Sequence, residues 1–233
     1  MSGEVAGVVL LSLKVALVAM AWAVPLAYGL AWLLARREFY GKTVLSAVIM
    51  LPLVMPPVAT GLFLLWVFGP ATPVGQFFAM LGLPLAFRWT GAALAAGLVA
   101  LPLIVRPIRL SLEAVDPKLD EALAVAGHAP ARRFFMLHLP LSLPGLVAGA
   151  VLGFAKSLGE FGATITFVAN IPGETRTLSL AMYSALQSID GGSLVLLLAA
   201  LSLGISLLSV IASELLLKWL TPLLTGRTEP IRA

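Results

Sequence analysis

The fold is decided by a polar stretch, Asp116–Gly145, which reads D-P-K-L-D-E-A-L-A-V-A-G-H-A-P-A-R-R-F-F-M-L-H-L-P-L-S-L-P-G. It is the one long polar interruption between strongly apolar segments. Its Asp-Pro start supplies a good N-cap and a first helical residue, and Gly127 is a natural helix stop. Pro130 can start a second short helix, which Pro140 is expected to end. The stretch therefore predicts a helix, a glycine elbow and a second helix.

The composition around this stretch is that of a membrane protein. Of the 233 residues, 60% are hydrophobic and 11% are charged, which is more apolar surface than a soluble domain can bury. We expect one transmembrane domain over residues 1–233, with a cytoplasmic loop at residues 110–142. The net charge of +4 fits basic membrane-facing loops and not nucleic-acid binding, because no basic run is interleaved with aromatic residues. The absence of cysteine excludes disulfides and thiolate metal sites, and we expect no metal site.

The apolar segments predict an all-α bundle of about five membrane-spanning helices, with a sixth between residues 69 and 90 as the less favoured alternative. Residues 69–90 read instead as an external re-entrant or interfacial segment, and residues 170–193 as a second external segment. The first span is not expected to be a signal peptide. It lacks the basic residues with which a signal peptide begins, and it is longer than the apolar core of one. Three prolines in the second span predict a deformed helix, which either lines a pathway or is a structural kink. The spans are expected at residues 8–34, 44–68, 91–108, 143–167 and 194–220.

The distribution of basic residues sets the expected orientation. Eleven of the fifteen Lys and Arg residues fall in three regions on one side of the predicted topology, among them Arg227 and Arg232 near the C-terminus. Since positively charged loops stay in the cytoplasm, we predict an outside N-terminus and a cytoplasmic C-terminus.

One ionisable pair lies within the fourth predicted span. Lys156 and Glu160 are four residues apart, so they share a helical face and can pair. Each costs roughly 2.5–3.5 kcal/mol on insertion scales, and they either line a polar pathway or form a mutually neutralised structural pair. The neighbouring hydroxyl groups are equally well explained by bonds to their own helix. The candidate pathway or gate residues are Lys156, Ser157, Gly159, Glu160, Gly162, Thr164 and Thr166.

The polar stretch resembles the EAA loop of ABC-importer permeases, which reads E-A-A, three residues, G, nine residues, I-x-L-P. The matching residues are Glu121-Ala122-Leu123, Gly127 and Leu137-x-Leu139-Pro140, with Leu123 and Leu137 as conservative departures. The resemblance implies a coupling helix that docks on an ATPase subunit, whereas an ordinary amphipathic cytoplasmic hairpin is the plainer alternative. The implied coupling residues are Asp120, Glu121, Ala122, Leu123, Gly127, Arg132, Leu139 and Pro140.

A narrower resemblance, to molybdate ABC-transporter permeases, covers essentially the whole chain. It rests on S-L-G-E-F-G-A-T-I-T-F at residues 157–167 and N-I-P-G-E-T-R-T at residues 170–177, followed by A-M-Y at residues 181–183. L-P-L-V-M-P-P at residues 51–57 and R-P-I-R-L at residues 106–110 agree with it. Sulfate and tungstate permeases share a looser version. The resemblance implies a type I importer permease in a bacterial inner membrane, with molybdate as substrate.

The same resemblance implies partners for this chain. A homodimer would carry two ATP-binding cassette subunits, and a periplasmic or lipid-anchored molybdate-binding protein would deliver the anion. The chain has no Gly-x-x-x-x-Gly-Lys-Ser/Thr loop, so we expect no bound cofactor here and ATP use by the partner. Arg88 and Arg176 could contact the binding protein, although anchoring at the membrane interface is the favoured explanation.

Two other functional classes remain to be weighed. A stand-alone secondary anion transporter would explain the spans and the charged pair, but not the coupling-type loop. An intramembrane enzyme is disfavoured because no catalytic motif is present, and both His128 and His138 fall in the cytoplasmic loop, where we expect solvated side chains. The sequence therefore favours a transport subunit.

Overall fold

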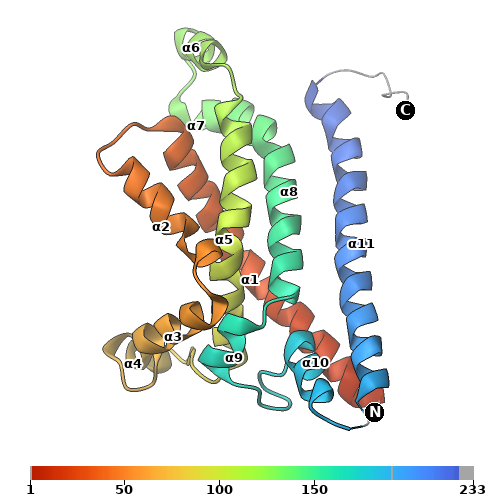
Figure 1. Cartoon of the computed structure of the whole chain (residues 1–233). Coiled ribbons are helices and arrows are strands. Elements are labelled where there is room, and N and C mark those ends of the chain that lie inside the picture. The colour runs from red at the N-terminus through yellow and green to blue at the C-terminus, as the bar shows by residue number, and fades with distance from the viewer. Residues whose placement is uncertain (1, 190, 226–233) are drawn as a thin grey trace.

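The computed structural model describes residues 2–189 and 191–225, and within these ranges every regular element is a helix. The predicted all-α class is confirmed (Figure 1). The elements are α1 (Ser2–Arg36), α2 (Lys42–Val54), α3 (Pro57–Phe68), α4 (Pro73–Met80), α5 (Trp89–Glu113), α6 (Pro117–Val125), α7 (Pro130–Arg133), the π-helical turn η1 (Phe134–His138), α8 (Leu139–Leu158), α9 (Gly162–Val168), α10 (Leu178–Leu186) and α11 (Gly192–Thr225).

The structure has four to five candidate spans, in agreement with the predicted bundle of about five, with changes to their bounds. Four segments of the described chain are long and apolar enough to cross a membrane: α1, α5, the continuous helix from Pro130 to Leu158, and α11. A fifth span is present if α2 and α3, which are bent by 115° at their break, are counted together as one. The alternative span at residues 69–90 contains only the eight-residue helix α4, which is too short to cross. The external segment after α9 contains a helix, α10, that the turn signals did not predict.

The core is built on α5, which packs against both α1 and α8. Alanines recur every fourth residue along α1, at positions 19, 23, 27 and 31, and all four are fully buried. Such a stripe of small residues lets two helices in a membrane approach closely. The most apolar window of α5 is 72% buried, whereas that of α11 is only 6% buried. Helix α11 therefore leaves most of its apolar surface for lipid or for another chain.

The second predicted span is broken because of consecutive prolines. The residue before a proline is driven to an extended conformation, and Met55 (ψ 144°) and Pro56 (ψ 132°) both obey this rule. Neither proline has an N–H to continue the helix. The deformation expected from the prolines is thus a sharp corner, after which α3 restarts at Pro57.

The fourth predicted span, residues 143–167, was wrong at both ends. The helix begins at Pro130 and passes straight through Pro140, which does not end it. In η1 the Leu139 N–H bonds to the Phe134 carbonyl five residues back, and this shift of register accommodates the amide that Pro140 lacks. At the other end α8 stops at Leu158, and α9 is a separate helix after a three-residue break.

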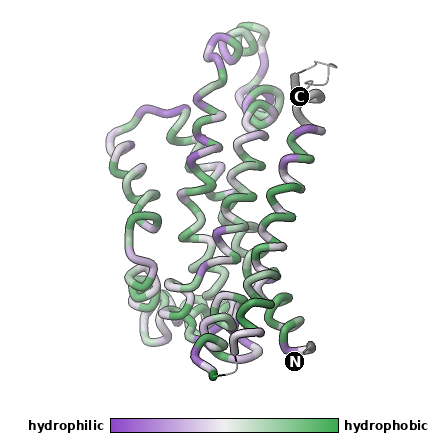
Figure 2. The backbone as a smooth tube through the Cα atoms, turned by 45° about the vertical axis from the view of Figure 1, so that its right-hand side comes forward, coloured by the Kyte–Doolittle hydropathy of each residue, from purple (hydrophilic) through white to green (hydrophobic). Residues whose placement is uncertain are grey.

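The two ends of the bundle differ in polarity. Helix α6 and the end of α11 lie at one end, whereas the N-terminus, α3, α4, α9 and α10 lie at the other (Figure 1). Hydrophilic residues gather at the α6 end and in the link between α1 and α2 (Figure 2). Two of the basic residues that predicted the orientation, Arg227 and Arg232, lie outside the described residues.

Candidate functional site

The predicted helix and glycine elbow are present at α6. Asp116 caps the helix by accepting the backbone N–H two residues on at 2.9 Å. At the other end Gly127 has φ +81°, a left-handed conformation that favours glycine. Its N–H bonds to the Ala124 carbonyl, and the N–H of His128 bonds to the Leu123 carbonyl, both at 3.0 Å. These two bonds form a Schellman motif, so the helix stop predicted at Gly127 is confirmed.

Helix α6 stands beyond the ends of the membrane helices and contains no buried residue (Figure 1). Glu121 and Ala122 are exposed on it, and so is Val125, at 90% of its surface. Exposed apolar groups beside an acid suit contact with another protein. Glu121, Ala122 and Gly127 are therefore exposed at this free end, which we call the α6 surface, whereas Leu123 is half-buried.

The other predicted coupling residues lie apart from this surface. Arg132 is exposed on α7. Leu139 and Pro140 are half-buried in the first turn of α8, because η1 continues the helix through them. The half-buried position of Leu139 and Pro140 suits residues that support the loop from within the chain, and not residues that contact a partner directly.

Asp120 points away from that surface, toward the membrane helices. Its Oδ2 lies 2.8 Å from Arg133 Nη1, and its Oδ1 lies 3.2 Å from His138 Nε2. The other ring nitrogen, Nδ1, lies 3.1 Å from Nη2 of Arg36 at the end of α1. His138 is only 7% exposed, so the prediction of a solvated side chain was wrong for it. The sequence gives no signal for this contact, since Arg36 and His138 are 102 residues apart.

The predicted pair of Lys156 and Glu160 forms, with 3.1 Å between Nζ and Oε2. Glu160, however, lies in the break after α8 and not on its helical face. Its second oxygen, Oε1, accepts the N–H of Ala163 at 3.0 Å and so caps α9. The carboxylate is buried (3% exposed), whereas the Lys156 side chain is one-third exposed (34%). Within one copy, the pair fixes the junction between α8 and α9.

One glycine of the candidate gate, Gly162, lies where α9 crosses α3. A Cβ at Gly162 would lie 2.6 Å from the Pro57 Cβ, and one at Gly61 would lie 2.5 Å from the Ala163 carbonyl oxygen. Both distances are shorter than real contacts allow, so the two helices approach as closely as their backbones permit. Gly61 belongs to this site and was not among the predicted residues, because the pairing of α3 with α9 is not visible in the sequence.

The hydroxyl groups near this crossing differ in their surroundings. Thr166 donates to the carbonyl of Gly162 in its own helix at 2.8 Å, as the plainer explanation expected. Thr164 and Ser157 are buried, whereas Gly159 is exposed. The Ser157 Oγ has no hydrogen-bond partner in the described chain.

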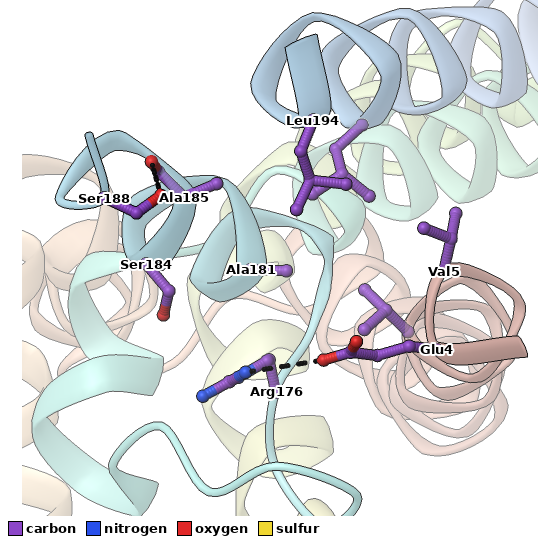
Figure 3. A pocket seen from close by; sticks show the side chains of 10 residues that line it. Glu4, Val5, Arg176, Ala181, Ser184, Ala185, Ser188 and Leu194 are labelled. Atoms are coloured by element: carbon purple, nitrogen blue, oxygen red, sulfur yellow. Dashed lines mark hydrogen bonds and ion pairs between the residues drawn. The ribbon is translucent and has the colours of Figure 1, made fainter. Parts of the chain in front are cut away.

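The two arginines predicted to be external, Arg88 and Arg176, form ion pairs within the chain. Arg88 Nη1 lies 3.3 Å from Glu174 Oε1, and its side chain remains 56% exposed. Arg176 donates from Nε to the Asn170 Oδ1 at 3.0 Å and lies 4.0 Å from Glu4. Glu4 and Arg176 point toward one another at a cavity of about 230 Å³ between α1, α10 and α11 (Figure 3). Of the two, Arg88 presents the freer charge.

Comparison with known proteins identifies what this arrangement is similar to. The family model described as binding-protein-dependent transport system inner membrane component matches residues 23–224. The chain is 51% identical over 209 residues to the molybdenum transport system permease protein ModB of Haemophilus influenzae, covering 89% of this chain and 91% of that protein. It is 48% identical over 207 residues to ModB of Escherichia coli, covering 88% and 90%.

Two further likenesses are weaker. The sulfate transport system permease protein CysT of Salmonella typhimurium is 36% identical over 161 residues, or 69% of this chain and 58% of that protein. The crystal structure of an amino acid ABC transporter with histidines matches with a TM-score of 0.60, covering 92% of this chain and 93% of that one. At 17% identity, the second match shows the fold alone, and it agrees with the predicted importer permease architecture.

Proposed function

Because the chain belongs to the family of binding-protein-dependent transport system inner membrane components, we propose that it is the permease subunit of an ATP-driven molybdate importer. It spans the membrane and carries the anion, and a separate ATPase supplies the energy. The observation that carries this proposal is α6, a free-standing helix with the coupling-type residues Glu121, Ala122 and Gly127 at one end of the bundle. The choice of molybdate rests on relatives at 51% and 48% identity that are named for molybdenum transport.

The charge of the substrate explains why a coupling helix is needed. Molybdate is a dianion, and moving it inward against about 100 mV costs roughly 4.6 kcal/mol, at about 2.3 kcal/mol per charge. A passive pore could not accumulate it. Since the chain carries no phosphate-binding loop of its own, ATP hydrolysis belongs to the partner, and this chain binds no cofactor.

The assembly follows from the surfaces that one copy leaves open. Only 6% of the apolar window of α11 is buried within one copy, and α3 exposes Phe63 and Trp66. We expect two copies to enclose the pathway, as one domain each, with two ATPase subunits at the α6 end. A periplasmic or lipid-anchored binding protein docks at the opposite end, near Arg88 and Arg176. This arrangement has the N-terminus outside and the C-terminus in the cytoplasm.

The candidate gate is the α8–α9 junction together with the α3–α9 crossing. It contains Lys156, which lies beside the break after α8, and its partner Glu160 pairs with it through Oε2 and caps α9 through Oε1. A partly exposed cation beside a locked carboxylate attracts a passing dianion without holding it tightly. The residues of this gate are Lys156, Ser157, Gly159, Glu160, Gly162, Thr164 and Thr166.

Uptake into proteoliposomes tests the function. Labelled molybdate should accumulate only when this chain, its ATPase, its binding protein and ATP are all present. Tungstate should compete because it is a similar tetrahedral dianion, and sulfate should not. Sulfate competing equally would keep the architecture and change the substrate, an outcome that the 36% identity to a sulfate permease makes worth measuring. Accumulation without ATP or partners would instead identify a secondary transporter.

Coupling-loop variants provide the internal control for that assay. Gly127→Ala places a side chain at φ +81°, which costs roughly 1–2 kcal/mol. If this strain destabilises the conformation in which α6 is bound to the ATPase, uptake should decrease about 5- to 30-fold. Glu121→Ala should also lower uptake. Gly41→Ala, at φ +91° in the link between α1 and α2, carries similar strain outside the loop and should lower uptake much less.

Arg88→Glu should weaken the productive contact with the binding protein. The ion pair with Glu174 is exposed, and such pairs contribute about 0–1 kcal/mol, so folding should be unaffected. Charge reversal at the outer rim should raise the concentration of binding protein needed for half-maximal uptake, and less so at high salt because screening weakens exposed charges. Arg88→Gln is the matched control, because it removes the positive charge without introducing a negative one. An unchanged concentration dependence in both variants would leave Arg88 as a membrane-interface anchor.

A further inference from the structure

The described chain joins α6 to its membrane helices through one small polar cluster, which we call the α6 clamp: Arg36, Asp120, Arg133 and His138. Helix α6 buries none of its residues. The side-chain hydrogen bonds that connect it to other helices among the described residues all end on Asp120. Apart from the chain on either side and its packing against α7, α6 is therefore tied to the bundle by hydrogen bonds at this one residue.

The donors and acceptors of the clamp form a directed chain. A guanidinium has donors only, so Arg36 Nη2 donates to His138 Nδ1 across 3.1 Å. That nitrogen must then lack a hydrogen, and the ring carries its hydrogen on Nε2, which donates to Asp120 Oδ1 across 3.2 Å. The imidazole thus bridges α1 and α6, with one ring nitrogen bonded to each side.

The π-helical turn places the imidazole in this bridge. His138 is the last residue of η1, where Leu137 and His138 are both buried. The helix runs on from His138 through Pro140 to Leu158 without a break. The ring is therefore fixed to a rod that ends beside the candidate gate at Lys156 and Glu160.

Helices α1 and α8 are also joined to each other near the clamp. The Tyr28 hydroxyl lies 2.9 Å from the Ser142 Oγ, and the Tyr28 ring packs edge-on against Phe134. Arg36 and Tyr28 are two turns apart on α1, so the clamp and this contact hold the same two helices at two levels. A displacement of Asp120 then moves α1 and α8 as a pair.

We propose that the α6 clamp transmits the motion of the ATPase to α8 and α1, and that His138 is the positioning residue at its centre. The proposal rests on the proposed function, in which α6 is the surface that the ATPase moves. Without the clamp, α6 can follow the ATPase while α8 stays behind. Hydrolysis then continues and less molybdate is carried for each ATP.

The experiment uses the full complex in proteoliposomes and measures molybdate uptake per ATP hydrolysed. His138→Leu and Arg36→Ala should each lower this ratio at least about fivefold, the lower range of coupling effects between sites. Basal ATPase activity and the amount of ATPase that copurifies should stay at the wild-type level. Arg37→Ala is the matched control, because Arg37 neighbours Arg36 but is exposed and makes no bond to the clamp among the described residues. Arg36→Lys, which can still donate to Nδ1, should recover part of the ratio.

A covalent bridge between residues 120 and 138 shows whether the α6 clamp transmits motion or only stabilises the fold. This chain has no cysteine, so Asp120→Cys with His138→Cys introduces its only two thiols. The reduced double variant should have a low ratio, and a short thiol-to-thiol crosslinker should restore it. Failure to recover in an assembled, crosslinked complex would overturn the proposal, and so would a wild-type ratio in His138→Leu. If the wild-type complex shows no ATP-dependent uptake, the proposed function fails instead.

Discussion

Glu160→Gln should lower the apparent melting temperature of the purified protein by about 4–12 °C. The substitution leaves the Lys156 ammonium at a break in the membrane helices without its partner at 3.1 Å. Removing one member of a buried pair costs roughly 3–5 kcal/mol, and because the Lys156 side chain is one-third exposed we expect about 2–3 kcal/mol. For a chain of this size each kcal/mol corresponds to roughly 2–4 °C. Loss of monodisperse protein after heating measures the shift without a thiol dye, which a chain lacking cysteine could not bind.

A double variant shows whether the unpaired charge is the cause. Lys156→Met removes the cation, so Lys156→Met with Glu160→Gln should recover most of the melting temperature, since the glutamine oxygen can still cap the Ala163 N–H. Lys156→Met alone should be destabilised, because it leaves a buried carboxylate without its cation. Additive losses in the double variant would contradict the pairing. The same double variant tests the gate, since it removes the fixed cation while preserving the cap, and its uptake of molybdate should decrease.

Local rules predicted the parts of this fold that depend on neighbouring residues. The Asp-Pro start of α6 and its stop at Gly127 involve bonds within a few residues, so capping preferences located both ends. The five apolar segments follow from hydropathy, which depends only on local composition. The spacing of Lys156 and Glu160 predicted their pairing, although Glu160 reaches Lys156 from the break after α8 and not from the shared helical face that was expected.

The errors arise where distant segments meet or where a rare backbone form overrides a common rule. Pro140 was expected to end a helix, but the five-residue hydrogen bond of η1 supplies the register that a proline needs. The burial of His138 depends on Arg36, on another helix. The close crossing of α3 and α9 at Gly61 depends on a 115° corner, and prolines alone predict a deformation but not its angle. These three features lie in or beside the coupling loop and the candidate gate.

Gly61→Ala should destabilise the protein and abolish most uptake, although it adds only one methyl group. In a helix with free space, glycine to alanine is stabilising by roughly 0.5–1 kcal/mol. At Gly61 the new Cβ would lie 2.5 Å from the Ala163 carbonyl oxygen and 2.8 Å from the Thr166 Cβ. The first of these is a backbone atom, so rotating a side chain cannot relieve the contact. Helix α3 must move away from α9, at a cost of roughly 1–3 kcal/mol for an overpacked contact.

Gly29→Ala is the matched control for this change. Gly29 lies within α1, and a Cβ there would meet nothing within 4 Å. The two substitutions are chemically identical, so opposite shifts in melting temperature can arise only from their surroundings. If both variants are stabilised, α3 and α9 separate at little cost and their crossing is no constraint on a gate. If Gly61→Ala alone is destabilised and retains ATP hydrolysis while losing uptake, the crossing is a part of the gate that must close tightly, because the energy supply is then intact and the pathway alone is altered.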